Sequence, residues 1–95
     1  MNTEKFVKYP CTNCDTGELL GYVITAHAVG VWDIVAVEVD GIVYKGFRYT
    51  MLNHGSKWAD FLGEFFNVPK PKNRWEHYSV AVGCRQGVEI LFDGN

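Results

Sequence analysis

The sequence predicts an α+β fold, an antiparallel β-sheet of five or six strands with one helix packed on a face. An Asp-Gly pair between two apolar runs indicates a β-hairpin, and residues 56–66 have the periodicity of an amphipathic helix. The expected order of elements is β-β-β-β-α-β-β, in which consecutive hairpins imply antiparallel pairing. The 95 residues suit a single domain, 1–95, because they contain no linker, repeat or low-complexity tract.

Two strand-like segments precede the hairpin. Residues 4–9, EKFVKY, have the composition of a strand and are expected to pair at an edge of the sheet. Residues 18–28, ELLGYVITAHA, form a longer β-rich run. Gly21 within this run marks a bulge or a point of close backbone approach.

Residues 31–50, VWDIVAVEVDGIVYKGFRYT, contain the clearest signal in the chain, two strands joined by Asp40-Gly41. This dipeptide favours a two-residue type I′ turn, which fixes the register of the flanking strands. The predicted opposite pairs are Val39–Ile42, Val37–Tyr44, Val35–Gly46 and Asp33–Arg48. Asp33 and Arg48 are also expected to form an ion pair.

Strand alternation then predicts what each face of this hairpin carries. One face is expected to be core, made of Val35, Val37, Val39, Ile42 and Tyr44. The other is polar near the turn, at Glu38 and Lys45, and apolar farther along, at Trp32, Ile34, Phe47 and Tyr49. Because both faces are apolar at that end, something must cover the second one, either the helix and the terminal strands or a partner.

Residues 56–69, SKWADFLGEFFNVP, predict the helix. Ser56 is a suitable N-cap, Asn67 tolerates the left-handed conformation that closes helices, and Pro69 prevents continuation. Gly63 is expected on the polar side. The buried stripe, at positions i, i+3, i+4, i+7 and i+8, is Trp58, Phe61, Leu62, Phe65 and Phe66.

The C-terminal part predicts a loop and two further strands. Residues 70–78, KPKNRWEHY, have the composition of a loop. Residues 77–84 and 88–92 are expected to be strands joined by a short hairpin at residues 85–87, in which Gly87 supplies a positive φ.

Cys11 and Cys14 have the C-x₂-C spacing with which one short loop supplies two ligands to zinc. A complete site needs two more ligands, and Cys84 with one histidine, such as His54, is the candidate set. A redox role would need the pair at the start of a helix, whereas the residues that follow predict a strand. We favour a third interpretation without a cofactor, in which Cys84 is a small buried strand residue and the other two are loop thiols.

The charge balance and the motifs weigh against several classes of protein. Nine basic and eleven acidic residues give a net charge of −2, whereas general nucleic-acid binding needs a basic surface. No segment resembles a signal peptide or a membrane span, so the expected location is the cytoplasm. We expect no enzymatic activity, because the sequence has no phosphate-binding loop, paired carboxylates or nucleophile motif.

This composition fits a small protein that presents a binding surface. We expect a protein-binding module, a stoichiometric inhibitor or modulator of another macromolecule, comparable in size to phage anti-defence proteins or to immunity proteins that pair with toxins. Aromatic residues make up 15% of the chain, and Trp, Tyr and Arg are enriched at interface hot spots. The expected contact residues are Trp32, Phe47, Arg48, Tyr49, Lys72, Arg74 and Trp75. For Trp32, Phe47 and Tyr49, burial in the core is the competing interpretation.

The alternative is a small nucleic-acid-binding domain. Residues 70–78 interleave basic and aromatic side chains, a combination that can follow a phosphate backbone and stack on bases. Zinc at Cys11 and Cys14 would brace such a domain. We favour the protein-binding function, because the rest of the chain supplies no further basic stripe.

Overall fold

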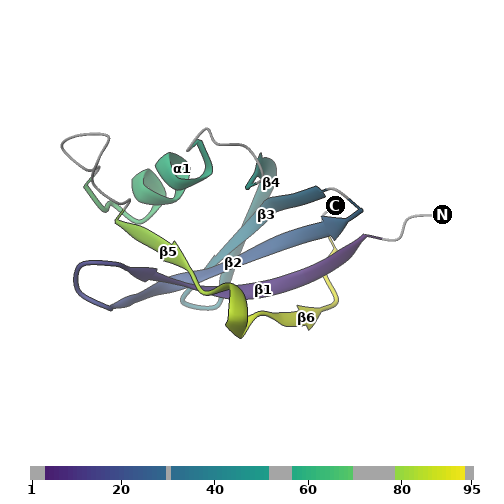
Figure 1. Ribbon diagram of the computed structural model, residues 1–95, viewed down its shortest axis with the longest axis horizontal. Helices are drawn as coiled ribbons and strands as arrows, with labels where there is room; N and C mark the ends of the chain where they lie inside the picture. The colour runs from purple at the N-terminus through teal and green to yellow at the C-terminus, as the bar shows by residue number, and fades with distance from the viewer. Residues whose placement is uncertain (1–3, 30, 52–56, 70–78, 94–95) are drawn as a thin grey trace.

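The described part of the chain forms a six-stranded antiparallel sheet with one helix, α1, against one of its faces (Figure 1). The computed structural model describes residues 4–29, 31–51, 57–69 and 79–93. The sheet order is β4-β3-β2-β1, with β5 and β6 both pairing along the other edge of β1. The predicted α+β class and element order are confirmed. The elements are β1 (Lys5–Asn13), β2 (Leu19–Ala28), β3 (Val31–Val39), β4 (Ile42–Thr50), α1 (Lys57–Phe65), β5 (Val80–Val82), the 3₁₀ turn η1 (Cys84–Gln86) and β6 (Val88–Ile90).

The first strand lies inside the sheet, so the expectation that it forms an edge is wrong. β1 pairs with β2 on one side. On its other side, residues 11–13 pair with β5 and residues 6–8 pair with β6. β5 and β6 therefore run in the same direction, one after the other along β1, as Figure 1 shows. The predicted hairpin between them is wrong, and η1 joins them instead.

Pro10 explains why this edge strand is interrupted. It lies between the two paired segments of β1, and its carbonyl accepts a hydrogen bond from the Gly83 amide at 2.9 Å. In an antiparallel strand the N–H and the C=O of one residue point to the same neighbouring strand. An N–H at position 10 would therefore point to the edge of β1 that pairs with β5 and β6, but proline has none. Because this edge lacks a donor at Pro10, the chain makes η1 there before it resumes as β6.

Gly87 is needed for close packing rather than for a positive φ. Its φ is −68°, which any residue can adopt, so the predicted turn role is wrong. A Cβ on Gly87 would clash with Cε1 of Tyr9. The missing side chain lets the Tyr9 ring lie directly against the backbone between η1 and β6.

The predicted turn of the β3–β4 hairpin is confirmed. Asp40 and Gly41 have φ values of 53° and 81°, and positive φ at both central residues is what a type I′ turn requires. The two predicted pairs nearest the turn are also confirmed, Val39–Ile42 and Val37–Tyr44. We refer to residues 36–45 as the turn half of the hairpin, and to residues 31–35 and 46–50 as its base half.

A β-bulge separates the two halves and changes the register of the base half. Residues 46–48 of β4 lie opposite a single residue of β3, Val35. Gly46, at φ 101°, has a backbone conformation that other residues rarely adopt. The predicted pairs Val35–Gly46 and Asp33–Arg48 are therefore wrong. The pairs that flank the bulge are Ala36–Lys45 and Ile34–Tyr49.

The bulge also changes which side chains of the base half face α1. Toward β2, Val35 is again the extra residue, because Ile24 pairs with Ala36 and Thr25 pairs with Ile34. Val35 packs on the face opposite α1, so the prediction that it shares a face with Val37 is wrong. The four residues assigned to the second face lie in the core beneath α1 instead, namely Trp32, Ile34, Phe47 and Tyr49.

Each face of the sheet has its own core, and the two are covered by different parts of the chain. The core on the helix face has the buried residues Tyr9, Cys11, Val23, Ile34, Val37, Ala59, Leu62, Val68 and Val80. The core on the opposite face has Ile24, Ala26, Val35 and Ala36, with Phe6, Ile90 and Phe92 packed against it. The helix covers one face and the terminal segments cover the other. Of the two predicted alternatives, cover by the helix and the terminal strands or cover by a partner, the first is therefore the one observed.

The end of α1 follows the predicted pattern. Asn67 has φ 57°. The amides of Asn67 and Val68 donate to the carbonyls of Glu64 and Gly63 at 3.2 and 2.8 Å, which is a Schellman motif. Gly63 is buried, so its predicted place on the polar side is wrong, and a Cβ there would contact the Val68 carbonyl oxygen at 3.4 Å. Ser56 lies outside the described residues. No helix in the described ranges is long and apolar enough to cross a membrane.

Candidate functional site

Two of the rings predicted as contact residues pack against α1. Phe47 and Tyr49 lie on Phe61, with ring centroids 4.7 and 4.4 Å apart, and the Tyr49 ring stacks on it. Both side chains are half-buried and belong to the core of the helix face. Core packing therefore occupies most of their surface.

Trp32 is also half-buried, in a cluster that joins three strands. Its ring centroid lies 6.2 Å from that of Tyr9 and 5.5 Å from that of His27. His27 Nε2 is 2.7 Å from Thr25 Oγ1 and 3.2 Å from the Tyr9 hydroxyl oxygen. Burial lowers the pKa of His27, so a neutral imidazole is favoured among these groups.

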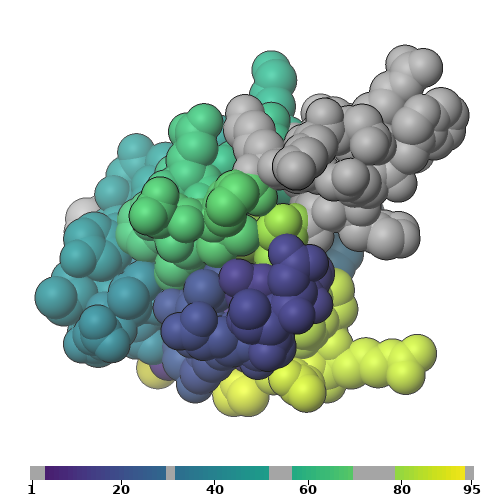
Figure 2. All heavy atoms as spheres, turned by 90° about the vertical axis from the view of Figure 1, so that its left-hand side faces the viewer, coloured from purple at the N-terminus to yellow at the C-terminus, as the bar shows by residue number. Residues whose placement is uncertain are grey.

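The large apolar side chains of β4 that remain exposed gather in the turn half. Ile42, Val43 and Tyr44 are 56, 42 and 44% exposed. The Tyr44 ring lies 5.3 Å from Phe65 of α1, and Phe65 lies 5.2 Å from Phe66. By strand alternation Ile42 shares the face of Tyr44. We refer to Ile42, Tyr44, Phe65 and Phe66 as the tip surface, and Figure 2 shows this end of the hairpin and α1 meeting on one side of the molecule.

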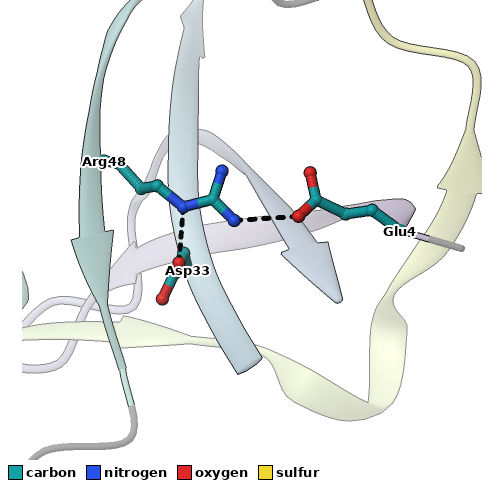
Figure 3. Close-up of polar contacts among 3 residues, drawn as sticks. All are labelled: Glu4, Asp33 and Arg48. Carbon is teal, nitrogen blue, oxygen red and sulfur yellow. Dashed lines mark hydrogen bonds and ion pairs between the residues drawn. The ribbon is translucent and has the colours of Figure 1, made fainter. Parts of the chain in front are cut away.

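Arg48 is held by two carboxylates on the opposite face of the sheet (Figure 3). Its Nε donates to Asp33 Oδ2 at 2.6 Å, and its Nη2 donates to Glu4 Oε2 at 2.9 Å. The hydrogen bonds to Glu4 and then to Asp33 raise the pKa of Arg48. The predicted ion pair between Asp33 and Arg48 is confirmed, although the two residues are not directly opposite. Figure 3 shows the remaining guanidinium nitrogen, Nη1, pointing away from both carboxylates.

Arg48 and Glu4 form the polar end of a cleft of about 430 Å³. The bulge accounts for this space, because β4 departs from β3 there and Gly46 has no side chain to fill it. Nothing lies within 4 Å of an ideal Cβ on Gly46. The chain after β6 borders the cleft and is held to β4 where Lys45 Nζ donates to the Asp93 carbonyl at 3.0 Å. We refer to it as the Arg48 cleft, and it is lined by Glu4, Phe6, Val35, Gly46, Phe47, Arg48 and Phe92.

Turn chemistry accounts for the spacing of the first two cysteines. Asn13 Oδ1 accepts a hydrogen bond from the Asp15 amide at 2.8 Å, and Gly17 has φ 76°. Cys14 lies exposed in this turn between β1 and β2. Cys11 precedes it in β1 and is fully buried, so its prediction as a loop thiol is wrong.

The structure does not bring the three cysteines together as metal ligands. Zinc binds thiolates, whereas burial, with a smaller contribution from Cys14, raises the pKa of Cys11 to about 12. Cys84 is exposed in η1, not buried in a strand as predicted, because the edge strand breaks there. Residues 4–29, 31–51, 57–69 and 79–93 contain no group of three or more side chains placed to hold a metal ion. His54 lies outside these ranges.

The predicted contact residues Lys72, Arg74 and Trp75 lie in 70–78, outside the described residues.

The sequence analysis missed the tip surface because alternation assigned Ile42 and Tyr44 to the core. A length comparison was the missed signal: α1 has nine residues and spans roughly 13 Å, while the nine residues of β4 span roughly 30 Å. One short helix cannot cover the whole hairpin. The Arg48 cleft had no sequence signal, since it depends on the bulge.

Comparison of this chain with protein-family models, curated proteins and solved structures finds no match.

Proposed function

We propose that this protein is a cytoplasmic protein-binding module, a stoichiometric inhibitor or modulator of another macromolecule, and that the tip surface contacts its partner. The exposed apolar side chains of the turn half carry the proposal. Ile42 and Tyr44 are about half exposed, and Tyr44 continues into the rings of α1. Apolar patches of this kind mark interaction sites, and Tyr is enriched at hot spots. The two earlier candidates Phe47 and Tyr49 support the surface from beneath through Phe61.

Charge around the tip surface indicates the chemistry of the partner. Asp40 and Glu64 adjoin it in sequence, in the hairpin turn and in α1, and both are exposed. Asp15 and Glu18 are exposed in the β1–β2 turn, and Figure 2 shows that hairpin beside the β3–β4 hairpin. An apolar centre with an acidic rim complements a protein surface whose apolar side chain is surrounded by Lys and Arg.

Side-chain contact fits this surface better than addition of a strand to β4. Strand addition relies on continuous main-chain hydrogen bonds along a sheet edge. Although β4 is the last strand of the sheet order, the bulge at residues 46–48 interrupts its regular ladder between Lys45 and Tyr49. Lys45 is exposed on this edge, and both a bulge and a lysine discourage pairing with another strand.

Site-specific crosslinking tests the proposal. A photoreactive p-benzoylphenylalanine is placed at position 42, and in a control protein at position 89, an exposed residue of β6 on the other edge of the sheet. After irradiation in cells that make the protein naturally, mass spectrometry identifies the crosslinked molecule. We expect one protein to be crosslinked from position 42 and not from position 89.

Binding of the purified pair then measures the contribution of the surface. Ile42→Asp should weaken binding about 30-fold or more, the size of a hot-spot loss. Val88→Asp is the matched control, because Val88 is 62% exposed, and it should leave affinity unchanged. Crosslinking to nucleic acid from position 42, or equal loss of affinity in the two variants, would contradict the proposal.

A further inference from the structure

We infer that the Arg48 cleft binds one uncharged apolar residue of an extended segment of a partner protein, whose main-chain carbonyl accepts a hydrogen bond from Arg48. The cleft lies on the face of the sheet opposite α1, so it is a second site, separate from the tip surface. Its test uses peptide probes and does not depend on the partner of the tip surface.

The volume and the walls of the cleft suit an apolar side chain together with the main-chain peptide groups beside it. At about 430 Å³ it is at the small end of the range for ligand sites. Its apolar lining includes Phe6 and Val35 from the sheet and Phe92 from the chain after β6. The rings of Phe6 and Phe92 are 5.2 Å apart and tilted, which leaves ring edges and faces available to an aromatic or branched side chain.

The polar end of the cleft offers a donor that is already oriented. Asp33 and Glu4 hold the guanidinium of Arg48 through Nε and Nη2. Figure 3 shows the third guanidinium nitrogen, Nη1, directed away from both carboxylates. Fixing the donor before binding lowers the entropy cost of the new hydrogen bond. The cleft therefore calls for a ligand that carries an acceptor.

The local charge selects an uncharged acceptor. Arg48 contributes one positive charge, and Glu4 and Asp33 contribute two negative charges at 2.9 and 2.6 Å from it. An anionic ligand would approach these two carboxylates as well as the guanidinium, whereas an amide carbonyl gains a charge-assisted hydrogen bond without that repulsion. A main-chain carbonyl is the acceptor that accompanies every apolar residue of a polypeptide.

The openness of the site favours a polypeptide over a free small molecule. About half of the Arg48 side chain, 48%, is exposed. Pockets for free ligands bury 70–90% of the ligand, whereas an open cleft leaves room for the chain on either side of the bound residue. A single anchoring residue is thus the part of the partner that enters.

NMR titration of the isotope-labelled protein tests the inference with three probes. N-acetyl-tryptophanamide is uncharged, N-acetyl-tryptophan carries a carboxylate, and acetyl-Ala-Trp-Ala-amide extends the chain on both sides. We expect the uncharged probe to shift the Val35 methyl, Gly46 amide and Arg48 Hε signals. The carboxylate probe should bind about threefold to tenfold more weakly, and the tripeptide at least as tightly as the single residue.

Two pairs of variants identify the contacts. Arg48→Lys keeps the charge but removes the second terminal nitrogen, and we expect about tenfold weaker binding, with Arg85→Lys in exposed η1 as the control. Phe92→Ala removes a wall and should also weaken binding, while Leu91→Ala changes a fully exposed neighbour and should not. The second pair keeps the test valid if Arg48→Lys does not fold.

Several results would overturn the inference. They are shifts confined to the tip surface, equal affinity for the uncharged and carboxylate probes, and unchanged binding in folded Arg48→Lys or Phe92→Ala. Binding of the single residue without the tripeptide would also overturn it, since the cleft would then admit a small molecule and exclude a polypeptide.

Discussion

The turn half of the β3–β4 hairpin leaves large apolar side chains exposed, whereas the base half buries side chains of the same kind beneath α1. Ile42 is 56% exposed and Ile34 is fully buried, although both belong to one hairpin and both lie on the helix face. The difference comes from the reach of a nine-residue helix and from the bulge that turns the base half toward it. Residue type alone therefore does not separate core from binding surface in this protein.

The largest expected effect compares the two isoleucines directly. Ile34→Ala should lower the free energy of unfolding by about 2–5 kcal/mol, because it leaves a cavity under α1. Ile42→Ala should change it by no more than about 0.5 kcal/mol, since the side chain is largely in water. Denaturant unfolding measures both variants. Equal losses would mean that the two halves share one core and that the tip surface is not a free surface.

The bulge is tested by Gly46→Ala. At φ 101° an alanine is strained, and nothing lies near its Cβ, so the expected loss of about 1–3 kcal/mol comes from backbone conformation alone. Glu89→Ala, at an exposed position in β6, should have little effect. An unchanged unfolding free energy for Gly46→Ala would show that the bulge does not need glycine.

Each half also carries an ion pair on the face opposite α1, and the two should differ in strength. Arg48→Gln leaves Asp33, with a 13% exposed side chain, without its charged partner, and should cost about 1 kcal/mol after allowance for the exposure of Arg48. Lys8→Gln breaks the pair with Glu38 in the turn half, where both side chains are partly in water. Its cost should stay below about 0.5 kcal/mol. The reverse order in thermal unfolding would refute this ranking.

The smallest effect concerns His27, beside Trp32 at the base of the hairpin. Burial lowers its pKa below the ordinary value of 6.5, so the unfolded chain binds the proton more readily than the folded one. Stability should be fully present above about pH 6.5 and should decrease as the pH falls below that value toward the folded pKa. His27→Gln should remove this part of the pH dependence in denaturant unfolding between pH 7 and pH 5. A pH dependence identical to that of the unmodified protein would exclude His27 as its source.

Local features of the chain were predictable where neighbouring residues decide them. The type I′ turn needs only Asp40 and Gly41, and the end of α1 needs only Asn67 and the residues beside it. The candidate site was less predictable. Alternation along one strand assumes an unbroken ladder, and the bulge opposite Val35 reversed its result for the base half.

The two strands at the other edge of the sheet, β5 and β6, also show that local sequence predicts a strand but not its partner. The composition of residues 80–82 and 88–90 indicated strands, and both are strands. Their partner was not in the local sequence, because Pro10 in β1 and the ring of Tyr9 over Gly87 decide where they pair and where they break. The burial of Cys11 and the exposure of Cys84 follow from that arrangement.

Local sequence was sufficient to predict the α+β class, the order of the elements, the hairpin turn and the closing of the helix, since these depend on propensity and on contacts within a few residues. The register beyond the bulge, the assignment of the rings to core or surface, and the Arg48 cleft depend on the folded arrangement. Those features depend on backbone irregularities whose cost is offset by packing between segments far apart in the chain, such as Glu4 with Arg48 and Phe6 with Phe92. A pattern read along one segment contains no information about such a contact.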